Sequence, residues 1–300
     1  MLFSVTASTV GRVTENTATD APPIAADPVT ALRALGDRLD RVVHDALEAH
    51  GPQAWRTPTP AAGWTVATQV AHLLWTDEVS LCAAREPDRF ARVHVAAAME
   101  DPAGYVDAEA DRVAAQPAAE VLGRWRRART ELADTLASAD PGERIPWFGP
   151  PMRPRSMATA RLMETWAHGT DLAVALGVAQ DFRRSAEVAD ALPHVARLGV
   201  RTRDFAHVLN GLEPPAEEYR VELRDAAGRV HAHGPDDAAQ RVTGGLEDFC
   251  LLVTRRVHRS DTDLVASGEG AERWLGLAQA FAGPPGTGPA PGSGVAEVAR

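Results

Sequence analysis

The chain has 300 residues, of which 45% are hydrophobic and 24% charged, and its formal net charge is −10. This length suits one large domain or two ordinary ones, while the acidity argues against nucleic acid or an anionic membrane as the main partner. The chain contains no lysine, and all 31 basic residues are arginine, which excludes enzymes that depend on a Schiff-base lysine or a P-loop lysine.

The first half of the chain is predicted to form a four-helix bundle over residues 27–180. Apolar residues recur there at helical spacing, and Thr65 and Ser156 are the predicted N-caps of the second and fourth helices. The predicted helices cover residues 29–50, 65–86, 118–137 and 156–177. Residues 140–154 hold five prolines and form a stiff aromatic loop. Residues 1–26 lack periodicity, and we expect them to form a disordered extension.

The character of the sequence changes after residue 182, and residues 183–283 are predicted to form a small α+β domain. Segments of alternating apolar and polar residues, with turn residues between them, indicate strands beside helices. The predicted order is a helix at 185–211, strands at 219–223 and 230–233, a helix at 244–258, a short strand at 263–266 and a helix at 269–282. Residues 284–300 are interpreted as a Gly/Pro-rich tail. The predicted fold class is therefore α+β, a helical bundle followed by a small domain with a sheet.

Glu164 and His168 are the most informative pair in the sequence. A carboxylate and an imidazole four residues apart lie one turn apart on the same face of a helix, and the two can bind one metal ion. His72, on the second predicted helix, is the candidate third ligand. Two histidines and a glutamate leave coordination positions open, which is typical of catalytic sites rather than structural ones. From these residues alone, a solvated surface pair explains the spacing of Glu164 and His168 equally well.

Asp171 lies on the same predicted helical stripe as Glu164 and His168. It either orients His168 as a hydrogen-bond acceptor behind the metal or is an acid on the helix surface, and the sequence leaves both interpretations open. Burying Glu164 without a partner would be costly, so we expect its carboxylate to be paired or bound to a cation.

Two helical segments carry a family resemblance. Residues 63–73 read GWTVATQVAHL, and residues 161–171 read RLMETWAHGTD. Both resemble the DinB-like metal-binding superfamily, specifically the actinobacterial group that includes mycothiol-dependent maleylpyruvate isomerases, and the similarity extends over about residues 28–285. The resemblance implies a DinB-like bundle with mycothiol as co-substrate. The residues that it implies as ligands of a divalent metal ion, usually zinc, are His72, Glu164 and His168.

The second half departs from those isomerases, which place an arginine in a Gly-Arg-Gly-type motif near the metal. The nearest equivalents here are Arg255 and Arg256, which lack the flanking glycines. Either could anchor a substrate carboxylate as a bidentate pair, or both could be surface arginines of a helix. Trp147, in the aromatic loop, is the candidate wall of a cofactor-binding cleft, with a core tryptophan as the alternative.

The resemblance and the ligand set together predict a divalent-metal-dependent, mycothiol-dependent enzyme that acts on a small electrophilic metabolite by S-transfer or thiol-assisted isomerisation. Two alternatives use the same residues, a metal-dependent hydrolase that activates water and a metal-binding module without catalysis. The expected partners are a small substrate and a low-molecular-weight thiol, in a monomer or homodimer. No apolar run reaches the roughly 20 residues that span a bilayer, and residues 1–20 lack the features of a secretory signal, so we expect a cytoplasmic protein.

Overall fold

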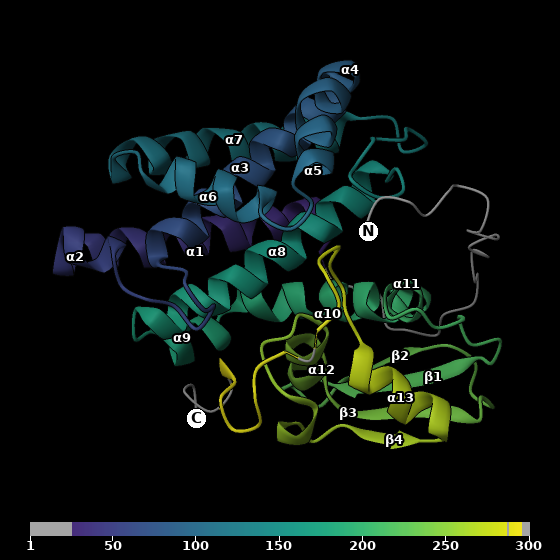
Figure 1. Cartoon of the computed structure of the whole chain (residues 1–300). Coiled ribbons are helices and arrows are strands. Elements are labelled where there is room, and N and C mark those ends of the chain that lie inside the picture. The colour runs from purple at the N-terminus through teal and green to yellow at the C-terminus, as the bar shows by residue number, and fades with distance from the viewer. Residues whose placement is uncertain (1–25, 287, 296–300) are drawn as a thin grey trace. The chain divides into compact units, whose positions relative to one another are not determined.

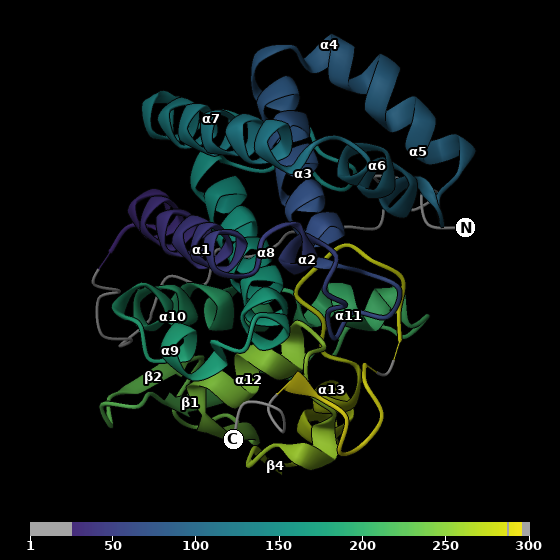
Figure 2. The same cartoon turned by 90° about the vertical axis from the view of Figure 1, so that its left-hand side faces the viewer.

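The computed structural model describes residues 26–286 and 288–295, which fall into two compact units. The first unit comprises residues 26–191 and the second residues 192–295, and the boundary lies inside a helix, α10 (Ala186–Arg201). The extension expected at residues 1–26 lies outside the described residues, apart from Ala26. The two units are described separately below, and Figures 1 and 2 show them from two directions.

Within the described residues, the regular elements of the first unit are all helices. Its helices are α1 (Pro28–His50), α2 (Pro52–Trp55), α3 (Val66–Arg85), α4 (Pro87–Phe90), a π-helical segment (Ala91–Val95), α5 (Ala96–Glu100), α6 (Tyr105–Ala114), α7 (Ala118–Ser138), α8 (Pro154–Ala175) and α9 (Ala179–Arg183), followed by α10. The four longest, α1, α3, α7 and α8, form the predicted bundle, in which α3 packs on α7 and α1 packs on α8 (Figure 1).

Each bundle helix turns large apolar side chains inward, as the helical spacing predicts. The most deeply buried are Leu35, Leu39 and Val43 of α1, Val70, Leu73 and Leu74 of α3, Val121, Trp125 and Leu132 of α7, and Leu162 and Trp166 of α8. Helix α3 begins as predicted, because the Oγ1 atom of Thr65 accepts a hydrogen bond from the backbone N–H of Thr68 at 3.3 Å.

The predicted start of α8 at Ser156 is wrong. The helix begins at Pro154, and Arg153 is the extended residue before it. A proline fits the first helical turn because the backbone N–H that it lacks has no partner there. The short helices between residues 87 and 114 were not predicted, since their apolar residues do not keep a regular period; α6, the longest of them, packs on α3.

The second unit is an α+β domain, which confirms the predicted fold class. After α10 it contains α11 (Arg203–Leu209), β1 (Tyr219–Arg224), β2 (Val230–His233), β3 (Gln240–Gly245), α12 (Leu246–Val253), a 3₁₀ turn (Arg259–Asp261), β4 (Val265–Ser267) and α13 (Glu269–Leu277). The sheet order is β2-β1-β3-β4, in which β1 and β3 are parallel and the two outer pairs antiparallel. One face of the sheet is covered by helices, where Tyr219 of β1 meets the ring of Trp274 at 5.7 Å.

Three predictions in this unit need correction. The helix expected at residues 185–211 is two helices, α10 and α11, separated at Thr202. Strand β3 was missed, and the helix expected from Gly244 begins only at Leu246, because Gly244 and Gly245 end the strand. Gly244 has a φ of 149°, and a Cβ there would lie 2.9 Å from the side chain of Leu264, so only glycine fits this position. Within the described parts of the chain, no helix is long and apolar enough to cross a membrane.

Candidate metal centre

Helices α3 and α8 meet along a row of polar side chains, which we call the polar seam. Its members are Gln69, His72 and Asp77 of α3, and Arg161, Glu164, His168 and Asp171 of α8. All are buried except Glu164, whose side chain is 24% exposed. The contacts pair Asp77 with Arg161, His72 with Glu164, and Gln69 with both His168 and Asp171. Because residue numbers rise along one helix as they fall along the other, the two helices run in opposite directions at the seam.

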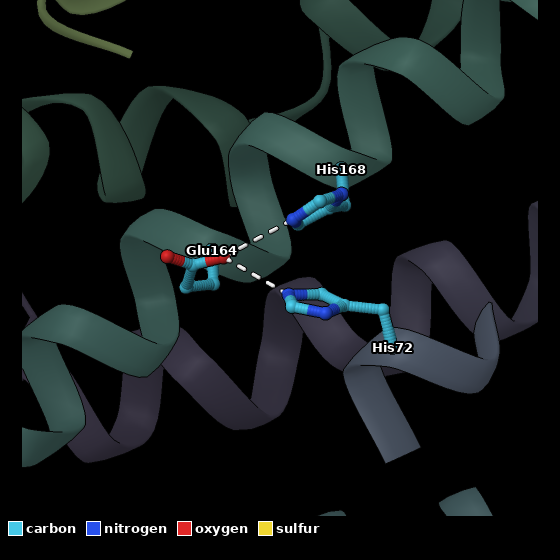
Figure 3. A group of neighbouring side chains, drawn as sticks. All are labelled: His72, Glu164 and His168. Carbon is cyan, nitrogen blue, oxygen red and sulfur yellow. Dashed lines mark hydrogen bonds and ion pairs between the residues drawn. The ribbon is translucent and has the colours of Figure 1, made fainter. Parts of the chain in front are cut away.

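The centre of the seam brings the three predicted ligands together (Figure 3). The Oε2 atom of Glu164 lies 3.1 Å from Nε2 of His168 and 3.5 Å from Nε2 of His72. The three ligand atoms lie within 4.8 Å of one another, and among the described residues they form the group that could hold a metal ion. Two imidazole nitrogens and a carboxylate oxygen are a donor set that suits zinc and other divalent ions. These residues therefore fit a metal ion.

The electrostatics of the cluster favour a charged glutamate. Burial raises the pKa of Glu164, but hydrogen bonds from His168 and His72 outweigh it, so that the pKa of this carboxyl lies well below its ordinary value. A carboxylate held in its ionised form is ready to bind a cation. The surface pair that the spacing also allowed is not what the structure shows, because His168 is buried and His72 joins Glu164 from another helix.

Gln69 is the residue that sequence reasoning missed. Its side chain is fully buried; its Oε1 atom contacts Nδ1 of His168, and its Nε2 atom donates to Oδ2 of Asp171 at 3.3 Å. Gln69 lies one turn before His72 on α3, which was the available signal, but its partners depend on how α3 and α8 are aligned. Asp171 is buried, so it is not an acid on the helix surface, and its contact with His168 through Gln69 is indirect.

Trp64 covers the two histidines from the start of α3. Its ring stacks on that of His168, with centroids 5.7 Å apart and planes inclined by 15°, and meets the ring of His72 at 5.3 Å. Trp64 lies in the segment 63–73 that carries the family resemblance, and no role in the site was predicted for it. Its aromatic surface restricts the orientation of both imidazoles and limits their contact with water.

Trp147 lies in an aromatic cluster. Its ring stacks on Phe90 at 5.9 Å and meets Phe148 at 5.1 Å, while Tyr105 connects Phe148 to Trp75, whose ring lies 6.2 Å from that of His72. The rings thus form a continuous path toward the ligands, with Trp147 at its distant end. The role of Trp147 in binding a cofactor stays a prediction.

Arg255 and Arg256 belong to the second unit. Arg255 lies just beyond the C-cap of α12, Thr254, and has a φ of 58°. Its guanidinium lies 6.0 Å from the ring of Phe281, and its Nη2 atom is buried without a hydrogen-bond partner among the described residues. Burial lowers the pKa of Arg255. Arg256 instead donates from Nη1 to the backbone oxygen of Thr254 at 2.6 Å. Arg255 is therefore the better candidate for binding an anion, and it does not lie on the exposed face of a helix.

The family model of the mycothiol maleylpyruvate isomerase N-terminal domain matches residues 32–173. Two uncharacterised proteins of Mycobacterium tuberculosis, one from strain H37Rv and one from strain CDC 1551, are each 52% identical over 267 residues, covering 88% of this chain and 99% of their own.

Crystal structures of the mycothiol-dependent maleylpyruvate isomerase and of a histidine-to-alanine mutant of it are similar in fold. Both have a TM-score of 0.51 and cover 82% of this chain and 93% of their own, with sequence identities of 14% and 15%. At this identity the similarity establishes the shared architecture of bundle and α+β domain.

Proposed function

The chain belongs to the mycothiol maleylpyruvate isomerase-like family, and from this premise we propose that it is a divalent-metal-dependent enzyme that uses mycothiol to act on a small electrophilic metabolite. The observation that carries the proposal is the cluster of His72, Glu164 and His168, assembled from two helices in the matched domain. Zinc is the metal that we expect, because imidazole and carboxylate ligands with open positions are typical of its catalytic sites.

A divalent ion bound by these residues lowers the pKa of a coordinating thiol, so that thiolate is available at neutral pH. The side chains of the protein determine the charge of the site and its contact with water. Glu164 supplies negative charge at the edge of the site, where its side chain is partly exposed, and Trp64 shields the imidazoles from water. A preformed and partly dry site favours reaction of a weakly solvated nucleophile.

The thiolate chemistry that we propose has two outcomes. Attack on a carbon that bears a leaving group forms a C–S bond and releases that group with its electron pair, which is S-transfer. Attack on an activated cis double bond forms a C–S bond and leaves a C–C single bond; rotation about it, followed by elimination of the thiolate, restores the double bond as trans. The second outcome consumes no thiol and needs no oxidant or reductant.

Arg255 is the proposed anchor for a substrate carboxylate. Its half-buried guanidinium has an Nη2 atom with no hydrogen-bond partner among the described residues, and a carboxylate can pair with a guanidinium through two parallel hydrogen bonds. Arg256 already donates to a backbone oxygen and is assigned no contact with substrate.

Two other functions use the same ligands. A hydrolase would employ the metal to activate water, and a module without catalysis would bind the metal alone. Membership of the family favours the thiol-dependent enzyme, and dependence on the thiol distinguishes the three.

The test begins with metal-free protein titrated with zinc. His72→Ala and Glu164→Ala should lose zinc affinity, while Glu120→Ala, an exposed glutamate of α7, should keep it; wild-type affinity in either ligand variant would refute the site. Zinc-loaded protein is then incubated with a panel of electrophiles, with and without mycothiol. Turnover that requires mycothiol supports the proposal, turnover without it indicates a hydrolase, and tight zinc binding without turnover indicates a module.

A further inference from the structure

The side-chain amide of Gln69 lies between His168, which is a candidate metal ligand, and Asp171, which is not. Its Nε2 atom is 3.3 Å from Oδ2 of Asp171 and 3.0 Å from Oγ1 of Thr59, and its Oε1 atom faces Nδ1 of His168. Gln69 is fully buried and Asp171 is 2% exposed. These groups therefore satisfy one another inside the protein, and their donors and acceptors must match.

Two neighbours determine which way the amide points. A carboxylate only accepts hydrogen bonds, so the NH₂ group of Gln69 must face Asp171. The hydroxyl of Thr59 donates to the backbone oxygen of Trp64 at 3.0 Å, so its oxygen is left to accept from the same NH₂ group. Both contacts place the carbonyl oxygen of Gln69 against His168.

The orientation of the amide then decides the hydrogen on His168. Because Oε1 of Gln69 can only accept, Nδ1 of His168 must carry the hydrogen. Its Nε2 atom is the nitrogen directed at Glu164. The hydrogen that Nε2 donates to the Glu164 carboxylate is the one that a metal ion would replace, while the hydrogen on Nδ1 stays hydrogen-bonded to Gln69. The partner of the other ring nitrogen commonly fixes which nitrogen of a histidine binds the metal.

We propose that Gln69 is a positioning residue. Asp171 accepts from its NH₂ group, so its oxygen must accept from Nδ1 of His168, and this leaves Nε2 as the nitrogen of His168 that binds the metal. This inference rests on the proposed function. In most sites of this kind a carboxylate or backbone oxygen contacts the histidine; here the side-chain amide oxygen of Gln69 contacts Nδ1 of His168. His72 has no such support, because its Nδ1 atom is buried without a hydrogen-bond partner among the described residues.

The proposal makes an unusual prediction for a pair of charge-swapping substitutions. Asp171→Asn removes the carboxylate that accepts from the NH₂ group of Gln69. The NH₂ group of the new asparagine can donate to the oxygen of Gln69, which then turns away from His168. Gln69→Glu alone places a second carboxylate beside Asp171, where like charges repel in a buried setting. In the double variant Q69E/D171N, the carboxylate at position 69 accepts from His168 Nδ1 and from the amide at position 171. The Thr59 hydroxyl, which lies 3.0 Å from Nε2 of Gln69, can turn from the backbone oxygen of Trp64 to donate to the same carboxylate.

The test measures zinc affinity by competition with a chromophoric chelator, and the hydrogen on His168 by long-range ¹H–¹⁵N spectra. Each single variant should bind zinc about 10–100-fold more weakly. In Asp171→Asn the oxygen that accepts from His168 can turn away, and in Gln69→Glu repulsion from Asp171 displaces the new carboxylate. The double variant should recover most of that loss. Asp181→Asn, the same substitution at an exposed position of α9, should change nothing. Wild-type affinity in Asp171→Asn, or a double variant no better than Gln69→Glu, would overturn the proposal.

The spectra separate this inference from the proposed function. Metal-free wild-type protein should show a hydrogen on Nδ1 of His168, and Asp171→Asn should lose it or show both forms in exchange. If wild-type protein failed to bind zinc while this hydrogen followed the substitutions, the proposed function would be wrong and the positioning role of Gln69 correct. Urea unfolding of every variant verifies that each is folded. If Gln69→Glu does not fold, Asp171→Asn, in which the side chain keeps nearly the same shape, is sufficient for the test.

Discussion

Asp77 and Arg161 form a buried ion pair one layer away from the metal centre, and removing either partner should destabilise the protein strongly. The Nε atom of Arg161 donates to Oδ1 of Asp77 at 3.0 Å, and the two side chains are only 3% and 6% exposed. Asp77→Leu would leave the guanidinium buried without its counter-ion, which costs about 3–5 kcal/mol. Total stabilities of domains are about 5–15 kcal/mol, so the loss should be easy to measure.

The double variant Asp77→Leu/Arg161→Met should recover most of this loss. Burial raises the pKa of Asp77 even though Arg161 opposes the shift, so the attraction does not fully offset the desolvation of the carboxylate. For an aspartate whose pKa is higher in the folded protein, the folded state binds more protons, and stability falls as pH rises through that range. A cavity of about 220 Å³ beside Asp77 gives the larger leucine room, and Nη2 of Arg161, which lacks a hydrogen-bond partner among the described residues, disappears.

The assay is urea unfolding of the metal-free protein at pH 7.5, followed by circular dichroism, for the wild type, both single variants and the double variant. We expect the free energy of unfolding of the double variant to lie within about 1–2 kcal/mol of the wild type, since apolar replacement of buried ion pairs is often neutral or stabilising. Single variants that each cost less than about 1 kcal/mol and add in the double variant would refute the reasoning, because independent sites are additive and a coupled buried pair is not.

Three further predictions concern other parts of the chain. Arg255→Ala should raise KM for a carboxylate-bearing substrate about 10-fold or more, as expected for the loss of a charged hydrogen-bonding partner, while Arg256→Ala should leave it unchanged; equal effects would contradict the assignment. Burial, helped by nearby arginines and His231, lowers the pKa of His233 to about 4; since the unfolded state then binds more protons, stability of the second unit should fall as pH drops from about 6.5 to about 4 and level off below. His233→Gln should flatten that pH dependence, and an unchanged profile would exclude His233 as its source. Gly169→Ala should destabilise the first unit by about 1–3 kcal/mol in urea unfolding, because its Cβ would lie 2.8 Å from the Phe182 ring; an unchanged midpoint would show that the ring moves away freely.

The sequence predicts the bundle well because its helices have a regular apolar period and clear ends. Helix α3 begins at the predicted cap, Thr65, and helix α8 ends just before Gly177, whose φ is 74°. The prediction fails where local signals compete. At the start of α8 a serine, a good capping residue, lies two positions inside a helix that a proline begins.

Strand β3 shows a different limit. Its residues, Gln240 to Gly245, include two glycines and little apolar alternation, so the sequence alone does not distinguish it from a loop. It is a strand because it lies between β1 and β4 and forms hydrogen bonds with both. Pairing of this kind depends on residues distant in the sequence and overrides local preference.

The residues of the candidate site also differ in how far the sequence alone could predict them. The spacing of Glu164 and His168 follows from one helix and could be predicted directly. His72 was the candidate third ligand on a separate predicted helix, and the family resemblance implied the same role. Gln69 could not be found, because its role depends on the alignment of α3 against α8. Asp171 had two possible roles in the sequence analysis, and its burial excludes that of an acid on the helix surface.

The polar seam explains how the two central helices can hold so many polar groups. Nearly every residue of α3 from Val66 to Ala83 is buried, so its polar side chains cannot be solvated and need partners inside the protein. Thr76 and Ser80 donate to backbone oxygens of α3 itself, whereas the longer buried polar side chains pair with α8. Asp77 meets a guanidinium on one side of the ligands, and Gln69 meets His168 and Asp171 on the other. The ligand layer therefore lies between two layers whose contacts are made by the protein itself. The two histidines are therefore held differently: His168 has a hydrogen-bond partner behind it in Gln69, whereas His72, whose Nδ1 has no partner among the described residues, is held by ring contacts with Trp64 and Trp75.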